Sequence, residues 1–561
     1  YIKRTAWQVF PENSRKQIKG KSMKKLSAVL DQTEACIATG LSHVRRLCDQ
    51  DGKMNVARLD SYQQVTSDLA VCTAEIQCAR NYLEYADEKG DVENQLASTF
   101  AAETLHNIRQ RLARFPSDYG LVNADLDKID LGVCGDLLSA SSLEALGRVI
   151  VERKGDLGAR GLDEEKILMA DTFRQFAEDV VKPLASRIHR EDMIIPDEIL
   201  DGVRELGCFG LSVPQRYGGL LPDDQEDNLG MIVVTEELSR GSLGGAGSLI
   251  TRPEIMARAL IEGGTEEQKQ HWLPKIAEGR PLCAIAITEP DYGSDVASLK
   301  LKATRVDDGW VLNGAKAWST FAGKSGVLLT LARTDPDPSA GHRGLSLFMV
   351  EKPEFDGESF EVAQEGGGSL TGKSIATLGY RGMHSFNLFF DDFFVPATHM
   401  IGEERGLGKG FYFTMRGFMG GRIQTAARAC GLMQAAFDVG LSYAQDRKVF
   451  DKPLADYQLT LVKFAKMAMY LGACRQFTYS VGRMMDAGGG QMEASLVKLL
   501  ACKLSEWTSR EAMQIHGGMG YAEETDASRY WLDARVLSIF EGTEETLALK
   551  VVGRSLVEQA A

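Results

Sequence analysis

The sequence predicts an α+β protein whose chain runs from helices through a β domain and back to helices. Apolar residues recur at helical spacing before about residue 282 and again from residue 411 onward. Between these stretches, apolar residues form short runs separated by Asp, Gly and Pro turns, which is typical of strands. Because helices and strands occupy separate stretches, we expect separate cores and no doubly wound sheet.

The first 280 residues are predicted to form two helical regions. The first region contains helical spacing at 35–47, 65–86 and 96–114. The second follows Asp163 and is interrupted by a loop at Cys208–Pro214. We therefore place an N-terminal helical extension at 1–155 and a helical domain at 156–280.

The middle of the chain is predicted to be the β domain. Its strand-like segments are Trp310–Gly314, Val327–Arg333 and Leu345–Val350. The strand-like pattern ends near Pro396, and long amphipathic helical runs follow from Phe411. We place the β domain at 281–400 and a C-terminal helical bundle at 401–561.

A faint internal repeat links the two ends of the chain. Arg80 lies 17 residues after Gln63, and Arg475 lies 17 residues after Gln458, with Tyr preceding Gln in both places. Gly-Leu-Ser occurs at residues 40–42 and again at 440–442. The extension is therefore either a degenerate copy of the C-terminal bundle or a chance likeness between amphipathic helices.

Composition excludes several classes of function. The net charge of −14, from 64 basic and 78 acidic residues, argues against a nucleic-acid or anionic membrane surface. The ten cysteines show no CxxC and no histidine spacing typical of zinc, which indicates reduced, buried thiols in a cytosolic protein without a metal. We find no signal-peptide pattern and no apolar stretch that would span a bilayer, so no membrane insertion is expected.

Two runs at the β domain carry groups that suit a ligand. Ala286–Asp295 offers the hydroxyls of Thr288 and Ser294 as the chain leaves a strand. Lys316–Phe321, expected on an adjacent strand, places Trp318 and Thr320 on one face, because strand side chains alternate. Taken singly, the first run could be any polar turn, and the second is better explained by a buried core tryptophan than by a ligand site.

Two further runs lie among the C-terminal helices. Gln514–Tyr521 has adjacent glycines after a helix, which suits close contact with a phosphate or a neighbouring chain. It is not a dinucleotide-binding fingerprint, because no strand precedes it. Phe540–Thr543 contains Glu541 before a glycine, which in isolation is typical of a solvated helix end.

In this order and spacing, the runs resemble the acyl-CoA dehydrogenase family over roughly residues 165 to 555. Gln514 and Glu541 are 27 residues apart, which is the family's spacing, and Asp446–Phe450 and Tyr457–Gln458 fill its other flavin-contact positions. The resemblance implies the family's fold, with a helical domain, a middle β domain and a C-terminal four-helix bundle. The N-terminal helical extension is additional to it.

The resemblance implies FAD as the cofactor. Thr288 and Thr320 would hydrogen-bond the flavin ring, and Trp318 would pack beside it. The implied contacts are Ile287, Thr288, Trp318, Ser319, Thr320, Arg447, Phe450, Gln458, Gln514, Gly517, Gly518 and Thr543. Those that would reach the FAD of a neighbouring subunit are Arg447, Phe450, Gln514 and Gly518. A homo-oligomer, either a dimer or a tetramer, is therefore implied.

The resemblance also implies the reaction. Glu541 would remove the α-proton of an acyl-CoA thioester while the β-hydrogen leaves as hydride to the flavin N5, and an electron-transfer flavoprotein in the bacterial cytoplasm would accept the electrons. Ser294 and Arg422 would contact the CoA moiety, and Phe540 and Gly542 would line the substrate site. Tyr292 departs from the small residue usual at its position, which puts the shape of the substrate channel in doubt.

The long extension is atypical of short- and medium-chain members, and we expect a short, branched substrate with a second carboxylate. Such a substrate needs a positive or strongly donating partner, because an unpaired buried charge is costly. Arg252 is the first candidate, although an arginine before a helix-starting proline could equally lie on the surface. The second choices are Tyr380, Arg381 and His384.

Other activities of the same fold stay open. Oxidative decarboxylation of a glutaryl-CoA type would release carbon dioxide, and a simple short or branched acyl-CoA would be revealed by a substrate panel. An oxidase would pass electrons to oxygen and make peroxide. A non-catalytic flavoprotein or scaffold would keep a flavin that no acyl-CoA bleaches.

Overall fold

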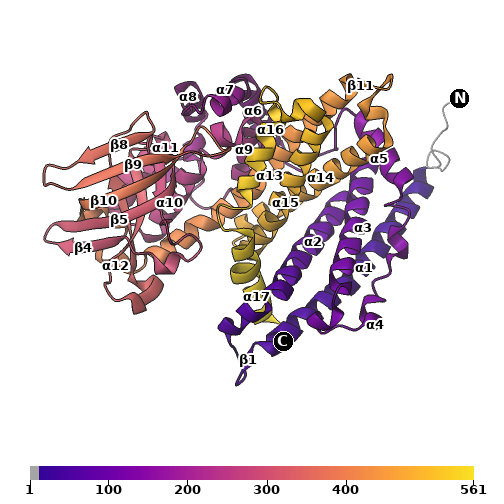
Figure 1. Cartoon of the computed structure of the whole chain (residues 1–561), viewed down its shortest axis with the longest axis horizontal. Coiled ribbons are helices and arrows are strands. Elements are labelled where there is room, and N and C mark those ends of the chain that lie inside the picture. The colour runs from indigo at the N-terminus through magenta and orange to yellow at the C-terminus, as the bar shows by residue number, and fades with distance from the viewer. Residues whose placement is uncertain (1–11, 561) are drawn as a thin grey trace.

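The computed structural model describes residues 12–560 and places one β domain beside a large body of helices (Figure 1). The N-terminal helices lie side by side at the right of the view, and a short turn that ends at Gly90 joins two of them, α2 and α3. Their bounds are α1 Glu12–Leu47, α2 Gln63–Asp87, α3 Asp91–Ala113, α4 Asn123–Leu126 and α5 Ala140–Glu152.

A second set of helices precedes the sheet, and polar side chains cap several of them. Asp163 accepts a hydrogen bond from the backbone of Lys166 at the start of α6, and Thr265 and Gln268 form a capping box at the start of α11. The bounds are α6 Glu164–Phe176, α7 Lys182–Arg190, α8 Asp197–Glu205, α9 Asn228–Gly241, α10 Thr251–Gly263 and α11 Glu266–Glu278.

The β domain is an eight-stranded sheet that is antiparallel except where β6 meets β3 and β4. Its strand order is β3-β6-β4-β5-β10-β9-β8, with β7 paired to β6. Burial alternates along β10 because the sheet is covered on one face, whereas β6 and β7 are buried throughout most of their length. The strands are β3 Cys283–Ala286, β4 Lys302–Val306, β5 Gly309–Thr320, β6 Val327–Arg333, β7 Leu345–Glu351, β8 Ser359–Ala363, β9 Ser369–Ile375 and β10 Ser385–Pro396.

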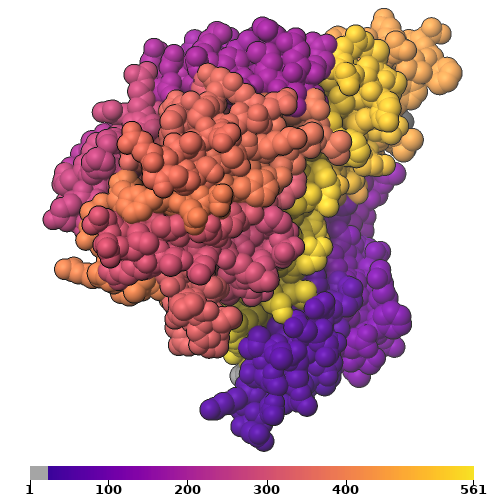
Figure 2. All heavy atoms as spheres, turned by 60° about the vertical axis from the view of Figure 1, so that its left-hand side comes forward, coloured from indigo at the N-terminus to yellow at the C-terminus, as the bar shows by residue number. Residues whose placement is uncertain are grey.

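The C-terminal helices return from the sheet and pack against the N-terminal ones. Their bounds are α12 Glu403–Gly406, α13 Gly410–Asp446, α14 Gln458–Asp486, α15 Gln491–Ile515, α16 Asp526–Leu537 and α17 Arg554–Gln559. Figure 2 shows the last part of the chain, in yellow, running between the β domain and the indigo N-terminal helices. The expected order of helices, sheet and helices is confirmed.

A single hydrophobic core joins the N-terminal helices to the C-terminal bundle, and the β domain has cores of its own. Glu103 on α3 accepts a hydrogen bond from Tyr470 on α14 at 2.7 Å and pairs with Lys466 of the same helix. All ten cysteines are buried and free, as expected. No helix within 12–560 is long and apolar enough to cross a membrane.

The two ends of the chain share an order of elements. α1 is followed by a hairpin at Asp49–Met54, a 3-10 turn at Val56–Tyr62, and then α2 and α3. α13 is followed by a hairpin at Lys448–Pro453, a 3-10 turn at Leu454–Asp456, and then α14 and α15. α2 and α14 both begin at the glutamine of a Tyr-Gln pair, as the sequence repeat requires.

Gly147 marks the closest approach between the extension and the bundle. A Cβ at this position of α5 would lie 2.0 Å from the carbonyl oxygen of Leu461 on α14. Because backbone cannot move aside as a side chain does, we expect Gly147→Ala to separate the helices and lower the free energy of unfolding by about 1–3 kcal/mol.

Urea unfolding of this variant and of Gly135→Ala measures the effect. Gly135 has a right-handed φ, and a Cβ there would approach only the Gly132 carbonyl, at 4.0 Å. We expect the control to unfold within about 0.5 kcal/mol of the native protein. Equal midpoints for the two variants would contradict the close contact.

Candidate active site

Glu541 lies in the turn that follows α16, and its backbone is left-handed. Its φ is +55° and that of Gly542 is +96°. The side chain faces α13, where a Cβ at Gly421 would lie 2.7 Å from the Glu541 Oε2. Glycine at 421 therefore leaves the room that this carboxyl occupies. A half-buried carboxyl held at a strained turn is a feature that clusters at functional sites.

Three cationic side chains surround this carboxyl. Arg422 donates to the Ser495 Oγ at 3.3 Å, and its buried Nε has no partner among the described residues. Burial lowers the pKa of Arg422, of Arg428 and of Lys498, and Glu541 opposes that shift in each case. The site is therefore electropositive, and Glu541 is the carboxylate that acts on all three cations.

Arg252 and Arg428 lie at the end of this site that Tyr380 and Phe540 mark. Arg252 is 8% exposed, so it is not a surface residue, and its Nη2 donates to the Tyr380 hydroxyl at 3.0 Å. Arg428 is fully buried, donates to the Thr251 hydroxyl, and lies 5.4 Å from the ring centre of Phe540. No carboxylate of residues 12–560 lies within ion-pair distance of either guanidinium.

Other buried arginines of this chain do have carboxylate partners. Arg475 binds Glu236 at 2.7 Å, and Arg529 binds Asp526 at 3.0 Å. The guanidinium keeps its charge at any physiological pH, so burial without a counter-ion costs free energy. The two unpaired arginines therefore favour an anionic ligand at this end of the site.

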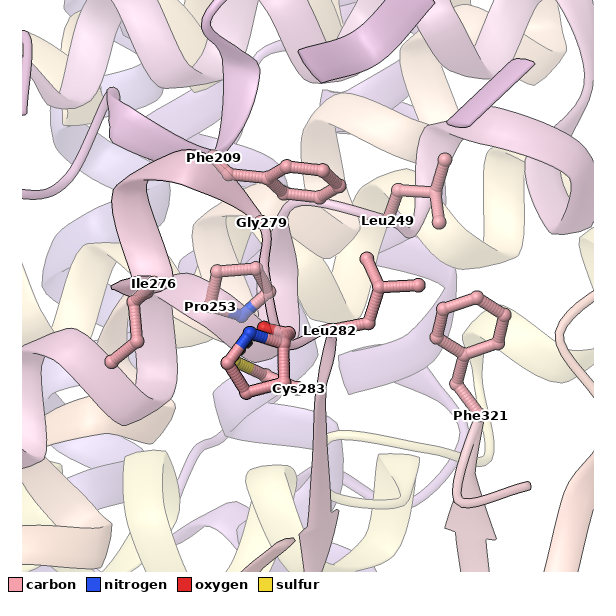
Figure 3. A pocket seen from close by; sticks show the side chains of 9 residues that line it. Phe209, Leu249, Pro253, Ile276, Gly279, Leu282, Cys283 and Phe321 are labelled. Atoms are coloured by element: carbon pink, nitrogen blue, oxygen red, sulfur yellow. Dashed lines mark hydrogen bonds between the residues drawn. The ribbon is translucent and has the colours of Figure 1, made fainter. Parts of the chain in front are cut away.

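The start of α10 is anchored by an apolar wall behind Arg252. Figure 3 shows Leu249, Pro253 and Phe321 gathered with their neighbours around a narrow gap. The gap has no room for a water molecule, so it is packing and not a binding pocket. This close packing fixes the backbone on either side of Arg252.

The residues expected at the flavin ring lie where β3 and β5 end. The Ala317 N–H donates to the Thr288 carbonyl at 2.8 Å, and the Thr320 hydroxyl bonds that of Ser385 at 2.9 Å. The expectation that β5 neighbours β3 in the sheet is wrong, because β3 pairs with β6. The two ends are joined instead by the bonds of Ala317 and Lys316 to the segment that follows β3.

Trp318 interrupts the pleat of β5. Its φ is +57°, and the pairing of β5 with β10 shifts register at this point. Its ring is 57% exposed, whereas the Ser319 hydroxyl is buried without a hydrogen-bond partner among the described residues. An exposed indole beside an unsatisfied hydroxyl fits the flat, partly polar edge of a flavin.

A buried ion pair holds the turn that carries Thr288 and Ser294. The Lys316 Nζ donates to the Ile287 carbonyl at 2.9 Å and to Glu289 at 3.0 Å. Glu289 also accepts the backbone N–H groups of Lys300 and Leu301, both at 2.7 Å. The pair thereby closes both ends of the 287–301 segment.

Ser294 connects this segment to the turn of Glu541. Its hydroxyl bonds that of Thr546 at 2.9 Å, and Thr546 in turn accepts from Thr543 at 3.1 Å. The structure thus brings Thr288, Ser294 and Thr543 to the same side of the molecule as Glu541.

A second group of expected FAD contacts lies elsewhere, at the far end of α13. A pocket of about 580 Å³ opens there, and Phe450 beside it is 89% exposed. Gln514, Gly517 and Gly518 follow from the end of α15 and are exposed. The pocket is lined by Val439, Ser442, Tyr443, Asp446, Arg447, His516 and Met519.

The two groups cannot contact one another in one chain. Arg422 and Asp446 are 24 residues apart on α13, which at about 1.5 Å per residue separates them by about 36 Å. Gln458 follows Tyr457, whose hydroxyl donates to the Val449 carbonyl beside Phe450, and its own amide donates to Glu144 of α5 at 2.7 Å. Arg381 and His384 also point elsewhere, to the His189 carbonyl and to Asp192.

Arg428 and Lys498 have no counterpart among the residues expected from the sequence. Each is a charged residue inside an otherwise apolar helical stretch, and both are buried. That interruption of an apolar run was the available signal, but helical spacing alone does not show which face meets the site.

The family profiles match nearly all of the chain beyond the extension. Acyl-CoA dehydrogenase, N-terminal domain, matches residues 163–280, the middle domain 284–393 and the C-terminal domain 408–557. With the fold and site above, these matches define a flavin-dependent oxidoreductase that acts on the CH–CH bond of acyl-CoA thioesters. The chain belongs to the acyl-CoA dehydrogenase family, and its cofactor is FAD.

Individual relatives differ in how much of the chain they match. The chain is 37% identical to a (2S)-methylsuccinyl-CoA dehydrogenase of Cereibacter sphaeroides over 95% of its own length and 97% of the relative's. The butyryl-CoA dehydrogenase structure from Megasphaera elsdenii has a TM-score of 0.64 at 30% identity, covering 71% of this chain and 99% of that one. A glutaryl-coenzyme A dehydrogenase in complex with glutaryl-CoA has a TM-score of 0.64 at 28% identity, covering 72% of this chain and 97% of that one. The first relative therefore matches the extension that the other two leave uncovered.

Lys316 gives the stability of this site a pH dependence. Burial lowers the pKa of Lys316 from its ordinary 10.5 to about 8, with Glu289 opposing the shift. Between these values the unfolded chain holds a proton that the folded protein has released, so stability rises with pH. We expect the unfolding free energy of the native protein to rise from pH 8 to 10.5, relative to that of a Lys316→Met/Glu289→Gln variant.

Urea unfolding of both proteins at a series of pH values measures this difference. Below pH 8 both states hold the proton, so the difference should be constant there. If the unfolding free energy of the native protein, relative to that of the variant, falls above pH 8, Lys316 keeps its charge through pairing with Glu289.

Proposed function

We propose that this protein dehydrogenates a short, branched acyl-CoA that carries a second carboxylate. The substrate that fits best is (2S)-methylsuccinyl-CoA, with mesaconyl-CoA as the product, in the ethylmalonyl-CoA pathway. The observation that carries the proposal is the pair of buried arginines without a carboxylate partner, Arg252 and Arg428, beside Tyr380 and Phe540 in the Glu541 site. A distal carboxylate supplies the missing negative charge.

The energetics favour a dicarboxylic substrate over a plain acyl chain. A carboxylate that accepts from a guanidinium forms a charge-assisted bond, stronger than a neutral one. Tyr380 orients Arg252 through its hydroxyl, and its ring meets Phe540 edge-on at 5.5 Å. An apolar acyl end would leave both guanidinium groups without a counter-ion, so its binding would not offset the cost of burying their charge.

Glu541 is the base in this proposal. Its carboxylate takes the α-proton of the thioester, and Gly421 leaves room for that carboxylate beside α13. FAD, when bound, accepts the electron pair and the β-hydrogen that the substrate loses. The backbone N–H of Glu541 has no acceptor among the described residues, so it is free to donate to the thioester oxygen as negative charge develops there. Arg422 adds positive charge to the same region.

The separation of the two groups of FAD contacts supports a homo-oligomer. Residues such as Arg447 and Gly518, beside the end of α13 that lies about 36 Å from Arg422, would complete the FAD site of a neighbouring subunit. We propose a dimer or tetramer on this basis, with an electron-transfer flavoprotein as electron acceptor. Ten buried free thiols are consistent with the reducing bacterial cytoplasm.

We also propose that residues 1–155 are a degenerate copy of the C-terminal bundle that packs an enlarged subunit. The shared order of helix, hairpin, 3-10 turn and two helices supports this origin. The common core and the contacts of Glu103 with α14 support the packing role. Loss of folded oligomer on removal of the extension would agree with it.

Oxidative decarboxylation of a glutaryl-CoA type is the second candidate. Arg252 and Arg428 would also accept a carboxylate one carbon further from the thioester, and the glutaryl-CoA complex shares the fold. Release of carbon dioxide during turnover distinguishes this reaction, because simple dehydrogenation keeps all the carbon atoms. Peroxide formation would indicate an oxidase instead.

Anaerobic flavin bleaching tests substrate and base together. We expect (2S)-methylsuccinyl-CoA to bleach the flavin at least about tenfold faster than glutaryl-CoA, isobutyryl-CoA or butyryl-CoA. Glu541→Gln removes the proton acceptor, and we expect a loss of about 10²–10⁴-fold. Preference for a monocarboxylic thioester would refute the substrate, and rapid bleaching by the variant would refute the base.

The arginine pair predicts a loss that depends on the substrate. Arg252→Ala and Arg428→Met should each lower kcat/KM for the dicarboxylic substrate by about 10²–10³-fold, because the buried carboxylate loses a charged partner. Turnover of isobutyryl-CoA should fall much less or rise. Arg416→Ala, an exposed arginine on the same helix as Arg428, is the matched control. Equal losses on both substrates would show that the pair has a structural role only.

A further inference from the structure

Lys498 lies beneath the turn that holds Glu541. It is on α15, is 1% exposed, and its Nζ donates to the Phe540 carbonyl at 2.6 Å and to the Gly542 carbonyl. One ammonium group therefore binds the carbonyls on both sides of the proposed base. Burial lowers the pKa of Lys498, while Cys502 and Glu541 oppose that shift.

The first of these bonds fixes the direction of a backbone donor. The Phe540 carbonyl and the Glu541 N–H belong to one planar, trans peptide unit, so they point in opposite directions. When Lys498 holds the carbonyl on the α15 side, the N–H must face away from α15. No acceptor within residues 12–560 takes this N–H, which leaves it available to a ligand.

The second bond fixes the other side of the turn. Glu541 and Gly542 both have positive φ, a conformation that a glutamate adopts only when its surroundings impose it. The backbone bonds that flank the turn are Phe540 to Val536 at 3.1 Å and Glu544 to Ser538 at 3.2 Å. Neither bond involves the Phe540 or the Gly542 carbonyl, and among the described residues Lys498 is the group that holds them.

We propose that Lys498 is a positioning residue that locks the turn of Glu541 through the Phe540 and Gly542 carbonyls, and so aims both the carboxylate and the backbone N–H of Glu541 at the thioester. This inference rests on the proposed role of Glu541 as base. The lysine acts through the turn and does not itself contact the reacting atoms.

Lys503 provides a matched control on the same helix. Its side chain is 42% exposed and pairs with the carboxylate of Glu544 at 3.1 Å, close to the same turn. It binds a side chain and not the backbone of Glu541. Exposed ion pairs of this kind contribute little to stability, so Lys503→Met should leave the turn in place.

Exchange of the α-proton in D₂O tests the inference, because it needs the base and the N–H but no loss of the β-hydrogen. The probe is an acyl-CoA with sulfur in place of the β-carbon, bound to flavin-loaded Lys498→Met, Lys498→Arg, Lys503→Met and Glu541→Gln. Exchange is followed by mass spectrometry and normalised to flavin content, with melting temperatures recorded. We expect Lys498→Met to exchange roughly 10- to 100-fold more slowly than the native enzyme, since a small misplacement of a reacting group costs this much.

Lys498→Arg should recover part of this loss, because it keeps charged donors of a different reach, and Lys503→Met should exchange at the native rate. Exchange by Lys498→Met within twofold of native, with Glu541→Gln inactive, would overturn the role of Lys498 alone. Native exchange by Glu541→Gln would overturn the base and this inference with it. If Lys498→Met yields no folded holoenzyme, Lys498→Gln takes its place because it removes the charge: a rate below about one third of native supports the lock, and a faster rate overturns it.

Discussion

The close approach of α13 to its neighbours is the constraint on which the site depends. At Gly431 a Cβ would lie 2.2 Å from the Glu236 carbonyl of α9, and at Gly421 it would meet the Glu541 carboxyl. Any side chain at these positions would hold α13 away from both partners. Because Arg422 and Arg428 lie on the same helix, their place in the site follows from the same approach. The geometry around Glu541 therefore depends on the absence of side chains at Gly421 and Gly431 of α13.

Unbalanced buried charge is the second organising feature. Where this chain buries charge for structure, it pairs the groups, as Arg475 does with Glu236 and Lys316 with Glu289. Around Glu541 the positive charges are not all paired, because Arg252, Arg428 and Lys498 are bonded mainly to neutral oxygens. A site with excess positive charge favours an anionic substrate and also a negative charge that forms during reaction. The same arrangement therefore serves binding and chemistry.

The sequence was informative where function depends on short, contiguous runs. The order of helices and strands, the turn at Glu541 and the glycines after α15 could all be predicted, because each is encoded within a few residues. Arg428, Lys498 and the bond from Tyr380 to Arg252 could not, since each joins elements more than 40 residues apart in the chain. Trp318 shows the limit of periodicity: a regular pleat was expected, and the positive φ and shifted register depend on pairing with β10.

The length of α13 has a consequence for how this chain tolerates change. The helix holds Arg422 in one ligand site and ends beside a second at Asp446, so the two are joined by a nearly rigid spacer. Each residue added to a helix rotates all later side chains about the helix axis by about 100°. Only insertions close to a whole number of turns return those side chains to their original directions. Loops between the strands of the sheet can lengthen without such a penalty. Insertions in this segment are therefore constrained by helical phase, whereas those in the β domain are constrained mainly by solvent access.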